Sequence, residues 1–477
     1  MKMSKFALTA MIASACCAGT AFGQSNRTAP RYYPASYYSY YQDGAATQAP
    51  APITSASNAS ASACCDKSPA CDVSDICNGK GKGSSCDSLG NCSCGNGACD
   101  GGCGGSGSGC GSGGLLGLGL LGGNCCIGEP LKLAPSPVAG FNIGGWTSVG
   151  YYHKNNPNSF NNYKDQVQLG QQWLYAEKIA DGSEGLGFGA RVDYIYGTDA
   201  PDTQAFGLTN NSWDNGWDNG VSGVGGASNG YGHAMPQLYG EVAMGDLSVK
   251  VGHFFTIVGN EVVQATGNHF YSRQFTFYNA EPFTHTGALT TYNVDADTQL
   301  YNGYVMGWDS GFEDNGDAYL GGFKKKLNDT FTLIYTTTLG TFTKANGENG
   351  NIQSVILTAA VTDELTYISQ TDWMYTRNNA GGTQRNTFGN INYLIYKVND
   401  CVSLGNRFEW FNFGGAGFNN VQNDDNFNFT TNVNYRVNAN LMFRPECRWV
   451  WDRQRFGFNE NNASSQAAIG GDMLFTF

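Results

Sequence analysis

The stretch FNFTTNVNYRV, residues 427–437, decides the fold. Its odd positions are mostly aromatic or aliphatic and its even positions are mostly polar, which is the two-residue period of a β-strand. The same alternation returns in LMFRPECRWVW, residues 441–451, and in AAIGGDMLFTF, residues 467–477. Each stretch has eleven residues, about the length of a tilted strand that crosses a bilayer. The end of the chain therefore predicts membrane-spanning strands.

The two faces of these strands differ in chemistry. Phe443, Trp449 and Trp451 share one face, whereas Arg444 and Glu446 share the other. A soluble sandwich also alternates, but its buried face is richer in Val, Ile and Leu, and its polar face in Lys and Glu. We therefore expect an all-β fold, a membrane-spanning antiparallel up-and-down β-barrel with aromatic residues towards lipid and charges towards a lumen.

Composition supports one large barrel with a tail. The 477 residues are 41% hydrophobic, 13% aromatic and only 14% charged, with 66 glycines. No run of eighteen apolar residues follows the N-terminal leader, so no membrane-spanning helix is expected. The net charge of -12 argues against a nucleic-acid partner.

The N-terminus has the pattern of a secretory signal peptide, residues 1–23. Lys2 and Lys5 precede an apolar run, and Ala21-Phe22-Gly23 forms a small-x-small cleavage site. Acylation at Cys16 or Cys17, as in a lipoprotein, is the less favoured alternative. Residues 24–63 are a low-complexity Tyr/Ala/Ser/Pro linker that cannot bury a core.

Residues 64–126 form a Cys/Gly-rich segment that we expect to be disordered and cross-linked, followed by a linker, residues 127–140. In an exported chain an even set of cysteines predicts disulfides, within the segment or between molecules. A zinc or copper site is disfavoured because paired C-x-x-C units are missing and no histidine precedes His153, so no metal is expected. Leu115 to Leu121 form either an apolar plug or a packing seam. The candidate disulfide residues are Cys64, Cys65, Cys71, Cys77, Cys86, Cys92, Cys94, Cys99, Cys103, Cys110, Cys125 and Cys126.

The strand pattern extends back to residue 141 and predicts about sixteen strands in a barrel of residues 141–477. The expected strands are 141–152, 167–178, 186–196, 236–243, 247–255, 287–293, 298–308, 317–326, 331–341, 351–361, 365–375, 387–398, 402–413, 427–437, 441–451 and 467–477. Tight Asn/Asp turns, such as 399–401 and 438–440, alternate with longer connections. This alternation is typical of outer-membrane barrels and places the short turns, both barrel ends and the N-terminal segment in the periplasm. Propeller blades lack the two-length alternation.

Several motifs carry a family resemblance. QLGQQWLYAEK (168–178), GFGARVDYIYGTD (187–199), GHFFTIVGNE (252–261), AEPFTHTG (280–287) and GWDSGF (307–312) resemble the OmpL-like family of β-barrel porins. The resemblance covers roughly residues 141–477 and leaves the cysteine-rich segment outside. It implies an outer-membrane barrel and a pore, but it assigns no substrate and no catalytic residues.

The connection 256–286 is too aromatic for a loop in water, so we expect it to fold into the barrel and narrow it. Lumen-facing charges on the strands would lie opposite this loop. They either set ion selectivity or pair with each other to hold the wall together. The pore-lining or constriction candidates are Arg191, Asp193, Glu261, Arg273, Glu281, Arg407, Glu409, Arg436, Arg444, Glu446 and Arg448.

An enzyme is not expected, because the five histidines lie beside no nucleophile motif, and no cofactor is predicted. The sequence predicts an outer-membrane porin for passive diffusion of small hydrophilic solutes or ions. The alternative is a structural envelope protein, with a non-conducting barrel as anchor and a cysteine-rich tether that cross-links to the cell wall or neighbouring proteins. Outer-membrane lipid and further copies in a homotrimer are the other expected partners.

Overall fold

The computed structural model describes residues 84–86, 92–94, 127–128, 130–155, 159–161, 163–205, 213–215, 217 and 230–477. The predicted signal peptide, the low-complexity linker and most of the cysteine-rich segment, with Leu115 to Leu121, lie outside these residues. Within that segment, β1 (Ser84–Cys86) pairs antiparallel with β2 (Cys92–Cys94), a short hairpin that the sequence analysis did not predict. Among the described residues, no helix is long and apolar enough to cross a membrane.

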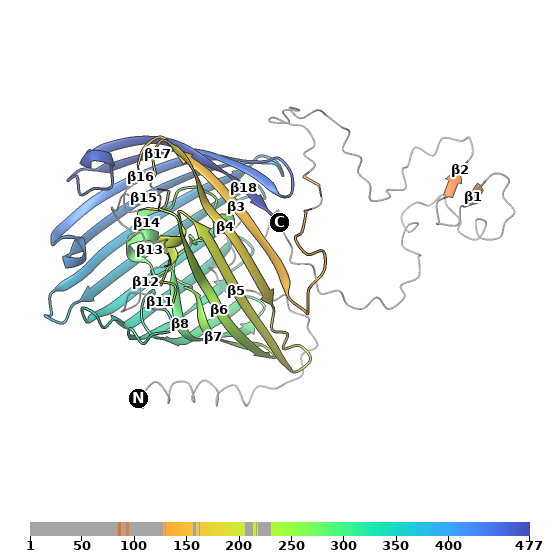
Figure 1. Ribbon diagram of the computed structural model, residues 1–477, viewed down its shortest axis with the longest axis horizontal. Coiled ribbons are helices and arrows are strands. Elements are labelled where there is room, and N and C mark those ends of the chain that lie inside the picture. Colours follow the sequence, from red (N-terminus) through yellow and green to blue (C-terminus); the bar gives the residue numbers. More distant parts are fainter. Residues whose placement is uncertain are drawn as a thin grey trace. The chain divides into compact units, whose positions relative to one another are not determined.

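Sixteen antiparallel strands close into a barrel, with β18 paired to β3 (Figure 1). The strands are β3 (Asn142–Tyr152), β4 (Gln166–Lys178), β5 (Leu186–Gly197), β6 (Gly232–Met244), β7 (Leu247–Phe255), β8 (Thr284–Asp295), β9 (Thr298–Val305), β10 (Asp317–Lys326), β11 (Phe331–Thr343), β12 (Glu348–Ala360), β13 (Leu365–Arg377), β14 (Thr383–Lys397), β15 (Val402–Gly415), β16 (Val421–Arg436), β17 (Leu441–Asp452) and β18 (Ser465–Thr476). The predicted fold class and strand number are confirmed. The largest boundary difference is at β16, which begins at Val421 because its ladder with β15 continues to Gly415.

The predicted alternation of faces holds along the C-terminal strands. On β17, Phe443 and Trp451 are 40% and 43% exposed on the outside, whereas Arg444 and Arg448 are fully buried on the inside. The charged residues of the wall therefore face the lumen, and the aromatic residues face outward.

One end of the barrel has short turns with a common geometry. In three of them an asparagine side chain accepts two backbone N–H groups: Asn328 from Thr330 and Phe331, Asn399 from Cys401 and Val402, and Asn438 from Asn440 and Leu441. Such side-chain turns close a hairpin without glycine. The longer connections, such as 306–316 and 453–464, lie at the other end.

Ile127 and Leu131, which precede the first barrel strand, are hydrogen-bonded to a turn at the short-turn end. Ala439 N donates to Ile127 O (2.7 Å), and the Asn440 side chain exchanges hydrogen bonds with the backbone of Leu131. Asn440 Nδ2 also donates to Thr476 O, 2.6 Å away near the end of β18. In the neighbouring turn Cys401 is disulfide-bonded, whereas Cys447 on β17 is a free cysteine.

Candidate functional site: a loop inside the barrel

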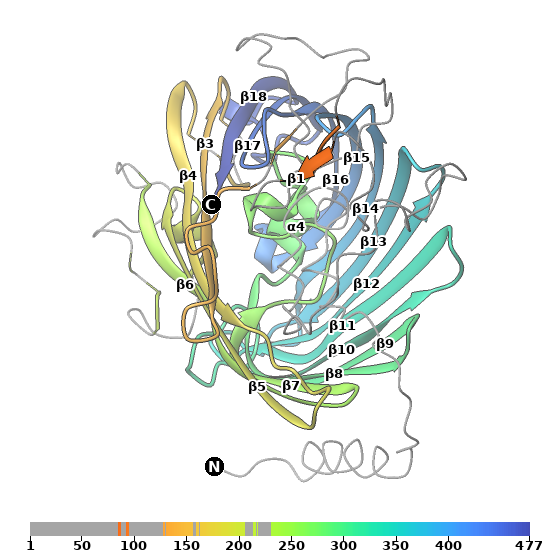
Figure 2. The ribbon, with the colours of Figure 1, turned by 90° about the vertical axis from the view of Figure 1, so that its right-hand side faces the viewer.

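The connection between β7 and β8, residues 256–283, lies inside the barrel and is called the inner loop. It contains a 3₁₀ turn (Ala265–Gly267) and helix α4 (Phe275–Ala280), and Figure 2 shows α4 within the ring of strands. The predicted loop 256–286 is three residues longer, because Thr284, His285 and Thr286 already pair with β7. Most of the inner loop is buried, so it is packed against the wall and not suspended in water.

Two carboxylates of the wall bind backbone N–H groups of the inner loop. Glu409 accepts from Phe275 N (2.9 Å) and Thr276 N (2.7 Å), the first residues of α4. Glu446 accepts from Tyr271 N (2.9 Å) and Ser272 N (3.2 Å). Buried carboxylates need such donors, because an unpaired charge in a protein interior is costly.

Two arginines of the wall bind carbonyl groups of the same loop. Arg407 forms an ion pair with Glu261 (2.6 Å) and donates to Ser272 O (3.0 Å). Arg444 pairs with Asp472 (2.6 Å) and donates to the backbone carbonyls of the 3₁₀ turn and its flank, Ala265 O at 2.8 Å and Asn268 O at 2.7 Å. The charges of β15 and β17 therefore hold the inner loop through its main chain.

The third arginine of this wall, Arg448, differs from the other two. Its guanidinium lies over the ring of Phe275, 4.4 Å from the centroid, and its Nε donates to Asn428 Oδ1 (3.2 Å). Within the described part of the chain its two terminal nitrogens have no hydrogen-bond partner. Arg436, on β16, is buried near the short-turn end of its strand.

The inner loop carries the other three predicted charges. Glu261 bridges to Arg407, and Arg273 donates to four nearby carbonyls of the loop itself, Val262 O (2.9 Å), Val263 O (2.9 Å), Tyr271 O (3.0 Å) and Phe270 O (3.4 Å). Arg273 thus fixes the shape of the loop and does not reach the wall through these bonds.

Glu281 is the third charge of the loop and lies beside Asp372 of β13. The amide nitrogen of Gln370 donates to both, 2.7 Å from Glu281 and 2.8 Å from Asp372. Burial and the nearby Asp372 carboxyl raise the pKa of Glu281 well above its ordinary value. A proton on Glu281 would remove the repulsion between the two buried carboxylates.

Arg191 and Asp193 are not part of this cluster. On β5, Arg191 pairs with Glu177 (3.1 Å) and Asp193 (2.6 Å), and Asp193 also accepts from Trp173 Nε1 and Gln237 Nε2, both at 3.1 Å. The structure thus divides the sequence-predicted charges into a group around the inner loop and a separate pair on β5.

The adjoining strands β12–β14 hold the inner loop in part by apolar contact. Phe270, in the loop, packs with Ile356 of β12, Ile368 of β13 and Ile391 of β14. The loop therefore contacts two adjoining stretches of the wall, the charged strands β15–β17 and the apolar residues of β12–β14. Burial of aromatic and branched side chains stabilises the loop but imposes no particular orientation on it. The hydrogen bonds and ion pairs of the charged strands fix the position of the loop.

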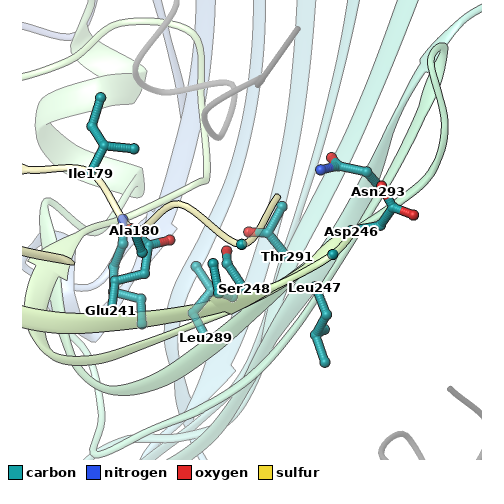
Figure 3. Close-up of a pocket in the computed structure, with 13 residues that line it drawn as sticks. Ile179, Ala180, Glu241, Asp246, Leu247, Ser248, Leu289, Thr291 and Asn293 are labelled. Carbon is teal, nitrogen blue, oxygen red and sulfur yellow. The ribbon is translucent and has the colours of Figure 1, made fainter. Parts of the chain in front are cut away.

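A cavity of about 80 Å³ remains inside the barrel towards the short-turn end. Its lining includes Glu241, Ser248, Lys250 and Thr291, and residues Ile179 and Ala180 of the β4–β5 connection pass above these strands (Figure 3). The Lys250 ammonium lies 4.3 Å from the ring centroid of Tyr239. This part of the lumen combines an acidic, a basic and two hydroxyl side chains, a lining suited to water and small polar solutes.

Sequence analysis missed several partners in the site. Asp472, Gln370 and Gln171 were not singled out, although Gln171 binds the loop at Val263 O (2.8 Å) and Ala265 N (2.9 Å). The alternation along each strand places these three residues on the lumen face, and that position was the only sign in the sequence that they could bind the loop. Among the described residues, no group of three or more His, Cys, Asp or Glu could hold a metal ion.

Residues 140–477 match the protein family described as "Putative beta-barrel porin-2, OmpL-like". No curated protein is similar enough to match the chain. Solved structures with a similar chain path include OmpT of Vibrio cholerae in its trimer form (10% identity, TM-score 0.48, 71% of this chain and 99% of that chain). The anion-selective porin from Comamonas acidovorans is similar at 8% identity, TM-score 0.48, and the same two coverages. At these values neither structure supports an inference about solutes or assembly.

Proposed function

Because the chain belongs to the OmpL-like family of β-barrel porins, we propose that it forms a narrow channel for passive diffusion of small hydrophilic solutes or ions. As a member of a porin family it is not an enzyme. The observation that carries the proposal is the inner loop, which lies inside a closed sixteen-strand barrel, is bound to β15 and β17, and packs against β12–β14. A loop fixed in this way would set the width of the channel.

The constriction is proposed to consist of the inner loop with Glu261, Arg273 and Glu281, and of the wall that binds it. The wall residues are Arg407, Glu409, Arg436, Arg444, Glu446 and Arg448, and the pair Arg191–Asp193 lines a separate part of the lumen. The hydrogen bonds of Arg407, Glu409, Arg444 and Glu446 to the loop support a role in holding the constriction open to a fixed size. Most of these charges are already paired, so they affect solutes mainly by holding the loop in place and less by binding solutes themselves.

Export and orientation are part of the same proposal. Residues 1–23 act as a signal peptide, the barrel lies in the outer membrane, and the N-terminal segment is periplasmic. The attachment of residues 127–131 to the turn 438–440 supports a common side for that segment and the short turns. Assembly into a homotrimer, and cross-linking by the cysteine-rich segment, remain predictions for the whole protein.

Single-channel recording of the purified full chain in planar bilayers tests the function. Discrete conductance steps are expected from a preparation whose electrophoretic mobility changes on heating, as a folded barrel requires. A heat-modifiable protein that gives no steps would overturn the channel and favour the envelope anchor. The dense burial of the inner loop is the observation that favours this second candidate.

A further inference from the structure

Two buried carboxyl groups meet where the inner loop contacts β13. Glu281, directly after α4, is 3% exposed, and Asp372 is 1% exposed. The amide nitrogen of Gln370 donates to one oxygen of each carboxyl group, so these two oxygens lie within two hydrogen-bond lengths of each other. The Gln370 amide is itself fixed, because its oxygen accepts from Gln274 Nε2 (3.0 Å) and Asn260 N (3.3 Å). The carboxyl groups are therefore held close together.

This pair differs from the other acidic groups around the inner loop. Glu261 has an arginine partner, and Glu409 accepts main-chain N–H groups. Among the described residues, Glu281 and Asp372 form no ion pair with Lys, Arg or His. The charged groups that act most on Glu281 are Asp372 and Glu261, which are both acidic. Two buried carboxylates without a cation are costly, so the pair requires positive charge from elsewhere.

Several buried oxygens at the pair accept no hydrogen bond within the described part of the chain. They include the second oxygen of each carboxyl group, Glu281 Oε2 and Asp372 Oδ1, and the amide oxygen of Gln274. The Ser354 hydroxyl is fully buried and also lacks a partner there, and Ser354 lies directly opposite Asp372 in the β12–β13 ladder. Buried polar atoms normally have partners, so this concentration of oxygens points to a missing ligand.

The main chain leaves room for one of these oxygens. Gly259, in the inner loop, has a φ of +87°, and a Cβ added there would overlap Glu281 Oε2. A side chain at position 259 would therefore displace the carboxyl group from its place beside Asp372.

We propose that Glu281 and Asp372 bind a divalent cation of the calcium type, which joins the end of the inner loop to β13. Calcium takes six to eight oxygen ligands in flexible geometry, and it accepts neutral amide, hydroxyl and carbonyl oxygens beside carboxylates. Two carboxylates neutralise its charge, and Gln274 and Ser354 offer neutral oxygens. Only two of these ligands are acidic, so the site does not depend on a cluster of three acidic side chains.

The position of the site gives the cation a structural role. Glu409 holds the start of α4, at Phe275 and Thr276, whereas Glu281 lies directly after its end. A cation between Glu281 and Asp372 would attach that end to the wall as well. Its removal would leave like charges facing each other and would weaken the attachment. The inference goes beyond the proposed channel and does not require that the barrel conducts.

Calcium titration of the full folded chain tests the site. After treatment with a chelator, the protein in zwitterionic detergent is titrated with calcium chloride in a calorimeter. We expect a dissociation constant of about 10⁻⁴–10⁻³ M, as in extracellular calcium sites. Urea unfolding should then show a higher midpoint in excess calcium chloride than in chelator, because a ligand of the folded state stabilises it.

Two single variants and a matched control identify the site. Glu281→Gln and Asp372→Asn should each weaken calcium binding by about tenfold or more, because the affinity follows the number of charged ligands. Either variant alone decides the matter if the other does not fold to a heat-modifiable barrel. Glu348→Gln is the control, since Glu348 is a buried acid that already pairs with Arg385, and it should bind calcium as the unchanged chain does.

Three results would overturn the proposal. The first is a urea midpoint of the unchanged chain that does not respond to calcium, which would mean that protons alone compensate the pair. The second is undiminished calcium binding in Glu281→Gln or Asp372→Asn, which would place the cation elsewhere. The third is an equal loss of binding in Glu348→Gln. Planar-bilayer recording of the same samples reports separately on the proposed channel.

Discussion

Glu409→Gln is the change that tests most directly how the inner loop is held. The buried carboxylate accepts from Phe275 N (2.9 Å), Thr276 N (2.7 Å) and Thr276 Oγ1 (2.9 Å). Glutamine keeps the size of the side chain but replaces one acceptor oxygen with an NH₂ donor. At least one loop donor then loses its acceptor inside the barrel.

The magnitude follows from those bonds. A hydrogen bond to a charged group contributes about 1.5–3 kcal/mol, and a buried donor without an acceptor costs about 1–3 kcal/mol. Since the glutamine oxygen keeps part of the interaction, we expect Glu409→Gln to lower the free energy of unfolding by about 2–4 kcal/mol. The start of α4 would be released locally, so the conductance should become larger or noisier.

Urea unfolding of the barrel in lipid vesicles, followed by tryptophan fluorescence, measures the stability, and planar-bilayer recording measures the channel. Glu348→Gln is the matched control, because Glu348 is a buried acid that pairs with Arg385 (2.6 Å) on another part of the wall. It should lower stability without changing the conductance. If both variants lose stability equally and neither alters the conductance, Glu409 does not position the constriction, and the reasoning is refuted.

Three further predictions concern the wall, the lipid face and pH. Arg444→Ala should lower the free energy of unfolding by about 3–5 kcal/mol in urea titrations, because it leaves buried Asp472 unpaired. Arg448→Ala removes no ion pair among the described residues and should lower the free energy of unfolding by less. A larger loss in Arg448→Ala than in Arg444→Ala would contradict the assigned pairing. Trp449→Arg should cost about 2–4 kcal/mol in the same assay if the outward face meets lipid near the midplane, and no loss would place it elsewhere. Burial raises the pKa of Asp309, in the β9–β10 loop, to about 6. Because this pKa lies above the unfolded value, the contribution of Asp309 to stability is complete below about pH 4 and lost as pH rises through 6; Asp309→Asn should remove that loss, and an unchanged difference between urea midpoints at pH 4.5 and 8 would count against it.

The strands could be predicted from the sequence because lipid on one side and a polar lumen on the other impose a two-residue period. The period is clear where Trp and Phe alternate with charge, as on β17, and all sixteen strands were found in this way. The aromatic content of residues 256–286 likewise predicted a loop inside the barrel.

The binding partners of the wall charges could not be predicted. Glu409 binds main-chain N–H groups more than a hundred residues away, and a backbone group leaves no mark in the sequence.

The charged wall binds the inner loop largely through peptide groups, with Glu409 and Glu446 on amide nitrogens and Arg444 on carbonyl oxygens. Peptide groups are the same whatever side chains they carry. The less buried side chains of the loop, such as Asn260 and Thr266, can therefore change while the attachment remains. Such a barrel can diverge in what it passes by point substitutions in one loop, and the same property makes the loop a natural place to engineer a new selectivity.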